Sequence, residues 1–113
     1  MIPSENENAA TLRKAFRLAL LELGKSPDYH IYDLTDDFLL GRKEGESRRL
    51  LIRVKQFFDG LKPEEQKYFI YECLERERHY RFWYLGDYHE KEWAKARADM
   101  EQKIQEAFPC RVL

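Results

Sequence analysis

Apolar side chains recur every three or four positions between residues 8 and 23, which places them on one face of a helix. They are Leu12, Phe16, Ala19, Leu20 and Leu23. Gly24 and the Ser26-Pro27-Asp28 run end this pattern, because glycine and proline interrupt helices. The spacing therefore predicts a first helix over residues 8–23.

Rings and polar residues alternate at residues 29–34, directly after the first break. Alternation of this kind is typical of a short strand. We favour an extended connector over a strand, with its apolar side chains laid against the core. These side chains are Tyr29, Ile31 and Tyr32.

The run from Thr35 to Gly45 predicts a short helix and then a break. Thr35 precedes two acids, as is common at the positive end of a helix. We expect this helix to run from Asp36 to about Lys43. Glycine costs about 1 kcal/mol relative to alanine inside a helix, so either a loop or hinge lies near Gly45 or one weakened helix continues through it.

The clearest pattern runs from Glu46 to Asp59, where a broad apolar stripe leaves the basic side chains outside it. The stripe consists of Leu50, Leu51, Val54, Phe57, Phe58 and Leu61. Gly60 ends the run, and Pro63 suits the first position of the next helix. We expect that next helix to reach about His79, with Phe69, Ile70, Cys73 and Leu74 pointing inward.

A ring-rich connector that ends at Gly86 precedes the last helix. Asp87 and Glu90 form a D-x-x-E pattern, which predicts a capping box at the start of that helix. Its narrow apolar stripe ends before Pro109 and consists of Trp93, Ala96, Met100, Ile104 and Ala107 or Phe108. The fold prediction is all-α, a compact single-domain bundle of four to five helices, frayed over residues 1–7 and with a short tail at 109–113.

The periodicity also predicts which side chains are buried. We expect a core of Leu12, Phe16, Leu20, Leu51, Val54, Phe58, Phe69, Ile70, Leu74, Trp83, Trp93, Met100 and Ile104. The length of 113 residues suits one modest core, and the 14% aromatic content is large for this size. Together these features predict a folded protein in spite of a charged content of 36%.

Charge and cysteine content narrow the class of protein further. A formal net charge of −1 is unlike that of a dedicated, strongly basic nucleic-acid-binding domain. We interpret Cys73 and Cys110 as free thiols rather than one bridge, since two cysteines make no disulfide framework. The N-terminus lacks the pattern of a signal peptide, and no stretch of 18 apolar residues exists. We therefore expect a cytoplasmic protein that makes no membrane contact.

No pattern for catalysis is present. The sequence has no G-x-S-x-G, H-E-x-x-H or C-x-x-C motif and no phosphate-cradling glycine loop. The spacing of Cys73, His79 and His89 matches no usual zinc arrangement, so we expect these residues to be core or surface side chains. The prediction is a protein that is not an enzyme and has neither a cofactor nor a bound metal.

Two basic segments are candidates for partner binding. Residues 42–55 hold six bases and two acids, a net charge of +4. The candidates there are Arg42, Lys43, Arg48, Arg49 and Arg53, and they could hold phosphates or else form a solvated face that pairs with neighbouring acids. The second segment, RERHYRFWYLGDY at 76–88, mixes three arginines with five aromatic rings. We expect Phe82, Trp83 and Leu85 in the core, and Arg76, Arg78, His79 and Arg81 in contact with a partner.

The order LKPEEQKYFIYECL and then FWYLGDYHEKEWAKARADMEQKI resembles the C-terminal part of phage ArpU/RinA-type transcriptional regulators, over residues 50–108. The resemblance implies a sigma-factor-like helix-turn-helix whose final helix enters the major groove. It matches Tyr88 and Trp93 with tyrosines of the family pattern, and Lys95 and Arg97 with its basic positions. Lys91 and Lys95 therefore join the candidate contact residues.

The last helix departs from the family pattern in its charge. Residues 89–92 (HEKE) replace small hydroxyl residues, and Asp99 and Glu101 add further acids that would repel phosphates. We predict a small phage or mobile-element regulatory protein that binds DNA or a nucleoprotein complex. The alternatives are a stoichiometric inhibitor of a host protein, as anti-CRISPR proteins are, or a helical adaptor module that forms a homodimer.

Overall fold

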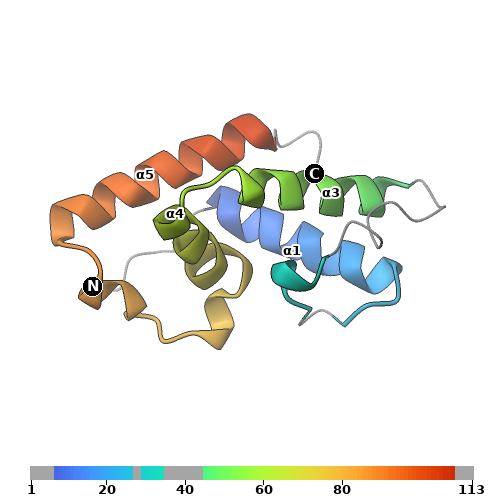
Figure 1. Cartoon of the computed structure of the whole chain (residues 1–113), viewed down its shortest axis with the longest axis horizontal. Coiled ribbons are helices and arrows are strands. Elements are labelled where there is room, and N and C mark those ends of the chain that lie inside the picture. Colours follow the sequence, from blue (N-terminus) through green and yellow to red (C-terminus); the bar gives the residue numbers. More distant parts are fainter. Residues whose placement is uncertain (1–6, 27–28, 35–44, 109–113) are drawn as a thin grey trace. The chain divides into compact units, whose positions relative to one another are not determined.

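The computed structural model describes residues 7–26, 29–34 and 45–108, and every regular element in them is helical (Figure 1). The α-helices are α1 (Glu7–Glu22), α3 (Glu46–Asp59), α4 (Pro63–Tyr68) and α5 (Glu90–Ala107). A π-helical stretch, η2 (Phe69–Leu74), continues α4, and the 3-10 turns are η1 (Ile31–Asp33), η3 (Arg76–Arg78) and η4 (Trp83–Gly86). The predicted all-α class is confirmed. The helix expected at 36–43 and the proline at 109 lie outside the described residues.

The chain divides into two units. Unit 1 comprises residues 1–13 and 62–113, and unit 2 comprises residues 14–61. Helix α1 begins in unit 1 and continues in unit 2. Unit 1 therefore combines two separate segments of chain, whereas unit 2 is one uninterrupted segment.

Unit 2 buries one face of α1 and one face of α3. The buried side chains are Phe16, Ala19, Leu20, Ile31, Leu34, Leu51, Val54 and Phe58. Helix α1 ends in a Schellman motif, in which Gly24 adopts a φ of +75° and Lys25 N–H donates to the Leu20 carbonyl at 2.8 Å. The connector at 29–34 contains a 3-10 turn rather than extended chain, because Leu34 N–H donates back to Ile31. This turn buries Ile31. Tyr32 stays 64% exposed, but its ring packs edge-on against the buried Phe58 with centroids 5.3 Å apart, so it lies against the core as expected.

Unit 1 is organised by an unusual helix. Helix α4 starts at Pro63, as predicted, and Lys62 N–H donates to Glu65 Oε1 at 3.0 Å in its first turn. The helix then widens into η2, where the Glu75 N–H donates to the Ile70 carbonyl, five residues back, at 2.8 Å.

The wide turn explains why the predicted helix does not continue to His79. Buried residues in this stretch come in two groups five positions apart, 68–70 and 73–75, which an α-helix cannot place on one face. Arg13, itself buried, donates from Nη1 to the Cys73 carbonyl at 3.1 Å. The Cys73 side chain is buried.

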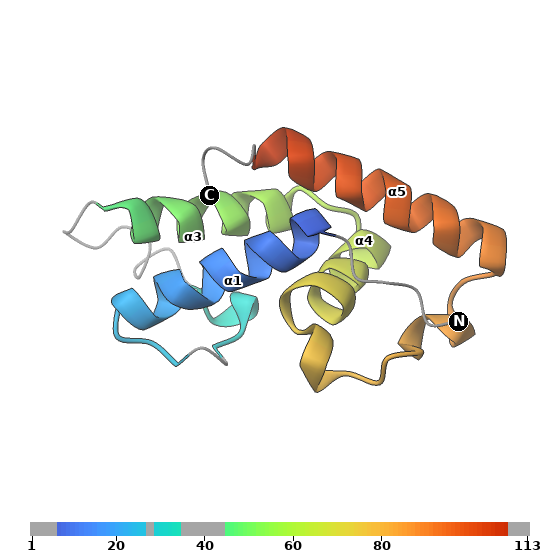
Figure 2. The ribbon, with the colours of Figure 1, turned by 180° about the vertical axis from the view of Figure 1, so that it is seen from behind.

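Between η2 and α5 the chain makes two 3-10 turns, η3 and η4, which Figure 2 shows from behind. Helix α5 starts at Glu90 with His89 as N-cap, so the predicted capping box at Asp87 was wrong. Asp87 instead accepts a hydrogen bond from Lys67 Nζ at 2.7 Å. Leu85 is 66% exposed, which also contradicts its predicted place in the core.

The predicted core is otherwise confirmed, apart from Phe82 and Trp83, which are only half-buried. In unit 1 the buried apolar side chains include Leu12, Tyr68, Phe69, Ile70, Cys73, Leu74, Trp93, Met100, Ile104 and Phe108. Glu101 on α5 accepts a hydrogen bond from Asn8 N–H at 3.2 Å, close to the positive end of α1.

We expect Leu74→Ala to lower the free energy of unfolding by about 3 kcal/mol, because it empties a buried site that is only 4% exposed. The same substitution at the exposed Leu85 should change it by less than about 0.5 kcal/mol. Urea unfolding of the two variants measures both values. Equal losses would show that the assignment of core and surface in this unit is wrong.

Candidate functional site

The basic residues predicted from the sequence divide between the two units. In unit 2, Arg48 and Arg53 are half-buried on α3, and Arg49 is exposed. Lys55 on the same helix donates to Asp59 Oδ1 at 2.9 Å. Arg42 and Lys43 lie outside the described residues.

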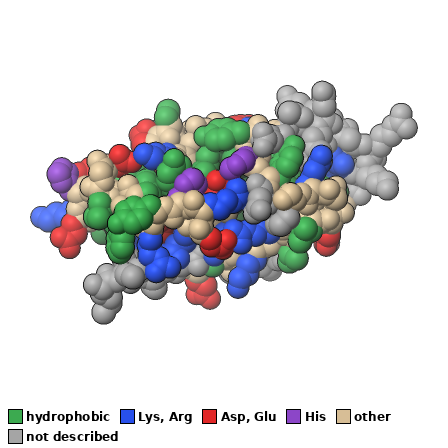
Figure 3. All heavy atoms as spheres, turned by 90° about the horizontal axis from the view of Figure 1, so that it is seen from below, with side chains coloured by type: hydrophobic (Ala, Val, Ile, Leu, Met, Phe, Trp, Pro, Cys, Tyr) green, Lys and Arg blue, Asp and Glu red, His purple; other side chains and the backbone are tan. Residues whose placement is uncertain are grey.

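In unit 1, acids of the chain itself pair with two of the predicted contact residues, Arg76 and Arg78. The Nε of Arg76 lies 3.3 Å from Glu72 Oε2, and the Nη1 of Arg78 lies 3.7 Å from Glu75 Oε1. Arg81 is exposed and forms no ion pair with any described residue. Over the face drawn in Figure 3, Lys and Arg side chains lie interspersed with acidic and apolar ones.

Arg76 and Arg81 meet at a small pocket of about 160 Å³, which we call the arginine pocket. It is lined by Tyr71, Glu72, Arg76, Glu77, His79, Tyr80, Arg81 and Trp83. The pocket forms next to the end of η2, because the chain turns back after Glu75 and places the His79 ring over the Tyr71 ring. The two rings stack with centroids 3.8 Å apart and an interplanar angle of 11°.

Hydrogen bonds fix the walls of the arginine pocket. Trp83 Nε1 donates to Glu72 Oε1 at 3.2 Å, and His79 Nε2 lies 3.2 Å from Oε1 of the buried Glu75. Tyr80 remains 73% exposed at the rim of this pocket, which Arg81 also lines. The pocket therefore combines fixed rings with one accessible ring and one accessible guanidinium.

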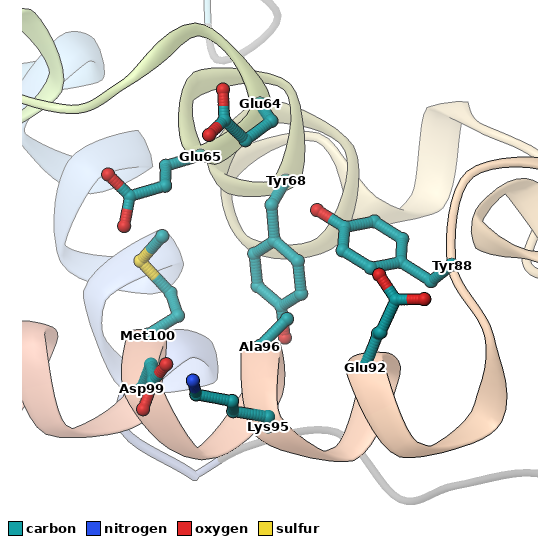
Figure 4. A pocket seen from close by; sticks show the side chains of 9 residues that line it. All are labelled: Glu64, Glu65, Tyr68, Tyr88, Glu92, Lys95, Ala96, Asp99 and Met100. Carbon is teal, nitrogen blue, oxygen red and sulfur yellow. The ribbon is translucent and has the colours of Figure 1, made fainter.

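A second pocket, of about 330 Å³, lies between α4 and α5, and we call it the acidic pocket. Figure 4 shows the side chains that line it, which are Glu64, Glu65, Tyr68, Tyr88, Glu92, Lys95, Ala96, Asp99 and Met100. Two carboxylates come from α4 and two from α5, while the two tyrosines and Met100 supply a less polar wall. Lys95 is the one base in this lining.

The electrostatic environment of the acidic pocket is negative. Burial and the neighbouring carboxylates of Asp87 and Glu64 raise the pKa of Tyr88 above its usual value. Partial burial works to raise the pKa of Glu65, but the hydrogen bonds from the Lys103 ammonium and Lys62 N–H outweigh it and lower that pKa. Glu65 is thus already occupied by internal partners.

Tyr68 forms a buried wall of the same pocket and is only 1% exposed. Its hydroxyl is buried and has no hydrogen-bond partner of normal geometry among the described residues. Burial raises the pKa of Tyr68 well above its ordinary value of 10.0, and Arg97 nearby offsets only part of that increase.

Trp93 on α5 contacts rings that line each of the two pockets. Its ring stacks on Tyr84 with centroids 3.9 Å apart and packs edge-on against Trp83 at 5.6 Å. It also lies 5.2 Å from the Tyr68 ring and 5.4 Å from the Tyr88 ring. The prediction that rings of the 76–88 segment contribute to the core is therefore confirmed for the contacts of Trp83 with Trp93.

The sequence did not point to the acidic pocket. No binding role was predicted for its acids, whereas Lys91 and Lys95 were expected to contact a partner. Both lysines are exposed on α5, but Lys95 lies among carboxylates. The available signal was the spacing of Glu92, Ala96 and Asp99, which puts them on one face of a helix.

The described part of the chain provides neither a metal site nor a membrane-spanning helix. No three His, Cys, Asp or Glu side chains gather there in a way that could hold a metal ion. None of the helices over 7–26, 29–34 and 45–108 has the length and apolar character needed to cross a bilayer.

Comparison with protein-family models, with curated proteins and with solved structures gave no match.

The unpartnered hydroxyl leads to a prediction for Tyr68→Phe. At neutral pH we expect the free energy of unfolding to rise by about 1 kcal/mol, because a buried polar group without a partner is removed. Since the Tyr68 pKa is higher in the folded protein than in the unfolded chain, wild-type stability should fall as pH rises above about 10, where only the unfolded chain releases this proton. The variant should lose less stability over that range.

Chemical denaturation at neutral and alkaline pH measures both effects. Tyr80→Phe removes a hydroxyl from an exposed ring and is the matched control. A loss of more than about 1 kcal/mol in Tyr68→Phe at neutral pH would instead indicate a hydrogen bond from Arg97 to the hydroxyl.

Proposed function

We propose that this chain is a small regulatory protein, of the kind that phages and mobile elements carry, and that it acts by binding a nucleoprotein complex rather than by catalysis. The observation that carries the proposal is the arginine pocket. There the exposed ring of Tyr80 and the exposed guanidinium of Arg81 flank fixed rings of His79 and Trp83.

This combination suits an unstacked base next to a phosphate. Aromatic side chains stack on bases of any sequence, and each such stack is worth about 1–3 kcal/mol. An arginine beside the ring can fork to phosphate oxygens or stack on a base. Because Arg76 and Arg78 are already paired with Glu72 and Glu75, Arg81 is the residue to which we assign the phosphate contact.

The charge of the chain favours a nucleoprotein complex over free nucleic acid. Phosphate contacts by many Lys and Arg residues supply most of the affinity of free DNA-binding proteins. Here the formal net charge is −1, and carboxylates already neutralise several bases. Few phosphate contacts remain, so a protein component of the complex has to supply much of the affinity.

The resemblance of residues 50–108 to ArpU/RinA-type regulators supports a role in regulation. It does not lead us to assign base reading to α5, since Glu92 and Asp99 would repel phosphates along that helix. The second candidate is a stoichiometric inhibitor or adaptor that binds protein alone. The internal pairing of Arg76 and Arg78 favours it, because paired arginines are poor phosphate ligands.

We expect Arg81→Gln to weaken binding of a short labelled single-stranded oligonucleotide. Each phosphate contact on single-stranded nucleic acid contributes about 0.7 to the slope of log affinity against log salt, so this variant should reduce the slope by about that amount. Fluorescence anisotropy between about 50 and 200 mM salt measures it. Lys62→Gln removes one exposed charge away from the arginine pocket and should leave the slope unchanged.

Affinity capture from cell lysate, with and without nuclease, separates the two candidates. A partner that is lost both on nuclease treatment and in Arg81→Gln is expected for the nucleoprotein proposal. One protein partner retained under both conditions would contradict it in favour of the inhibitor or adaptor.

A further inference from the structure

We propose that the acidic pocket between α4 and α5 binds a lysine or arginine side chain of a partner protein. The inference rests on the proposed function only for the existence of a protein component in the complex. It concerns other residues than the arginine pocket, so the two can fail separately.

The shape and the walls of the pocket suit a long basic side chain. Its volume of about 330 Å³ is enough for one such side chain together with part of its backbone. Tyr68, Tyr88 and Met100 offer ring and thioether surface to the methylene stem, while the carboxylates lie around them (Figure 4). Lysine and arginine commonly bury their stems in this way and leave the charged end among polar groups.

The carboxylates of the lining are largely uncommitted. Glu65 is engaged by Lys103, but Glu64 and Asp99 form no ion pair with any described residue. Glu92 Oε1 lies 3.9 Å from Nε2 of the exposed His89, which is close to the longest distance that counts as an ion pair. Glu64, Glu92 and Asp99 therefore surround the pocket with negative charge that an entering cation can pair with.

The Tyr68 hydroxyl adds one acceptor to the wall of the pocket. The buried Tyr68 hydroxyl has no partner of normal geometry among the described residues. A guanidinium group carries five N–H donors in a fixed fork, and an ammonium carries three, so either can bond to carboxylate and hydroxyl oxygens together. The face of the Tyr88 ring can also attract a cation.

The lining favours an organic cation over a metal ion. A calcium or magnesium ion needs several oxygens within about 2–2.6 Å of one point. The described residues contain no group of three acids gathered in that way. Dispersed carboxylates beside rings instead suit a long side chain with an apolar stem and an ammonium or guanidinium group at its end.

Lys95 provides a second test, in which a substitution is expected to strengthen binding rather than weaken it. Its ammonium is the one base among the lining residues, and it stands at helical spacing from Glu92 and Asp99. It therefore competes with an entering cation for the same carboxylates. Removing its charge should strengthen binding, whereas removing the charge of Glu92 or Asp99 should weaken it.

The test uses the full-length chain and a short neutral peptide that carries one arginine, with citrulline in its place as the uncharged control. Isothermal titration calorimetry gives the dissociation constants. We expect the arginine peptide to bind and the citrulline peptide to bind at least about tenfold more weakly. Asp99→Asn and Glu92→Gln should each weaken binding about threefold, and Lys95→Gln should strengthen it about threefold.

Glu106→Gln is the matched control, since Glu106 is an exposed acid of α5 that does not line the pocket. All four substitutions are on exposed residues, and circular dichroism verifies that each variant keeps its helices. Equal binding of the arginine and citrulline peptides would overturn the inference. So would weaker binding by Lys95→Gln, or the same loss in Glu106→Gln as in Asp99→Asn.

A lysine version of the peptide separates the two cations, and binding of either basic peptide over citrulline supports the pocket. Arg81→Gln distinguishes this inference from the proposed function. It should leave peptide binding unchanged while it weakens oligonucleotide binding. A loss of peptide binding in Arg81→Gln would contradict the assignment of the two ligands to separate pockets.

Discussion

The structure of unit 1 depends on the burial of two groups of residues that are five positions apart. Residues 68–70 and 73–75 are all buried, and only a helix that widens to i→i+5 hydrogen bonding can turn both groups to the same side. The wide turn makes the chain leave the helix after Leu74. The 3-10 turn that follows brings His79 back over Tyr71 and creates one pocket, while Tyr68 at the other end forms a wall of the second.

Regular periodicity made much of this fold predictable. Helices α1, α3 and α5 bury apolar residues at spacings of three and four, and for α1 and α3 the expected and observed bounds agree closely. Phe69, Ile70, Cys73 and Leu74 also recur at spacings of three and four, so a continuous α-helix was expected there. The spacing of five between the two buried groups is not part of a regular helical or strand period, and it was not recognised as a sign of the wider η2. The start of α5 was misplaced for another reason, since Asp87 pairs with Lys67 from α4, and sequence patterns do not carry contacts between distant residues.

The two pockets differ in how far they could be predicted from the sequence. Glu72 and Arg76 are four residues apart, so their pairing on a helix could have been expected from spacing alone. Predicting the acidic pocket would require knowing that α4 lies against α5 and that Lys103 forms an ion pair with Glu65. Tertiary packing therefore brings together acids that are far apart in the sequence. This explains why the residues predicted to contact a partner were basic and not acidic.

Trp83 and Trp93 are the two tryptophans of the chain, and both belong to unit 1, where their rings touch edge-to-face. Intrinsic tryptophan fluorescence consequently reports on this unit alone and is blind to residues 14–61. Far-ultraviolet circular dichroism, by contrast, sums the helices of both units. A single cooperative transition requires the two signals to change together, and any separation between them would reveal that the units melt as independent parts.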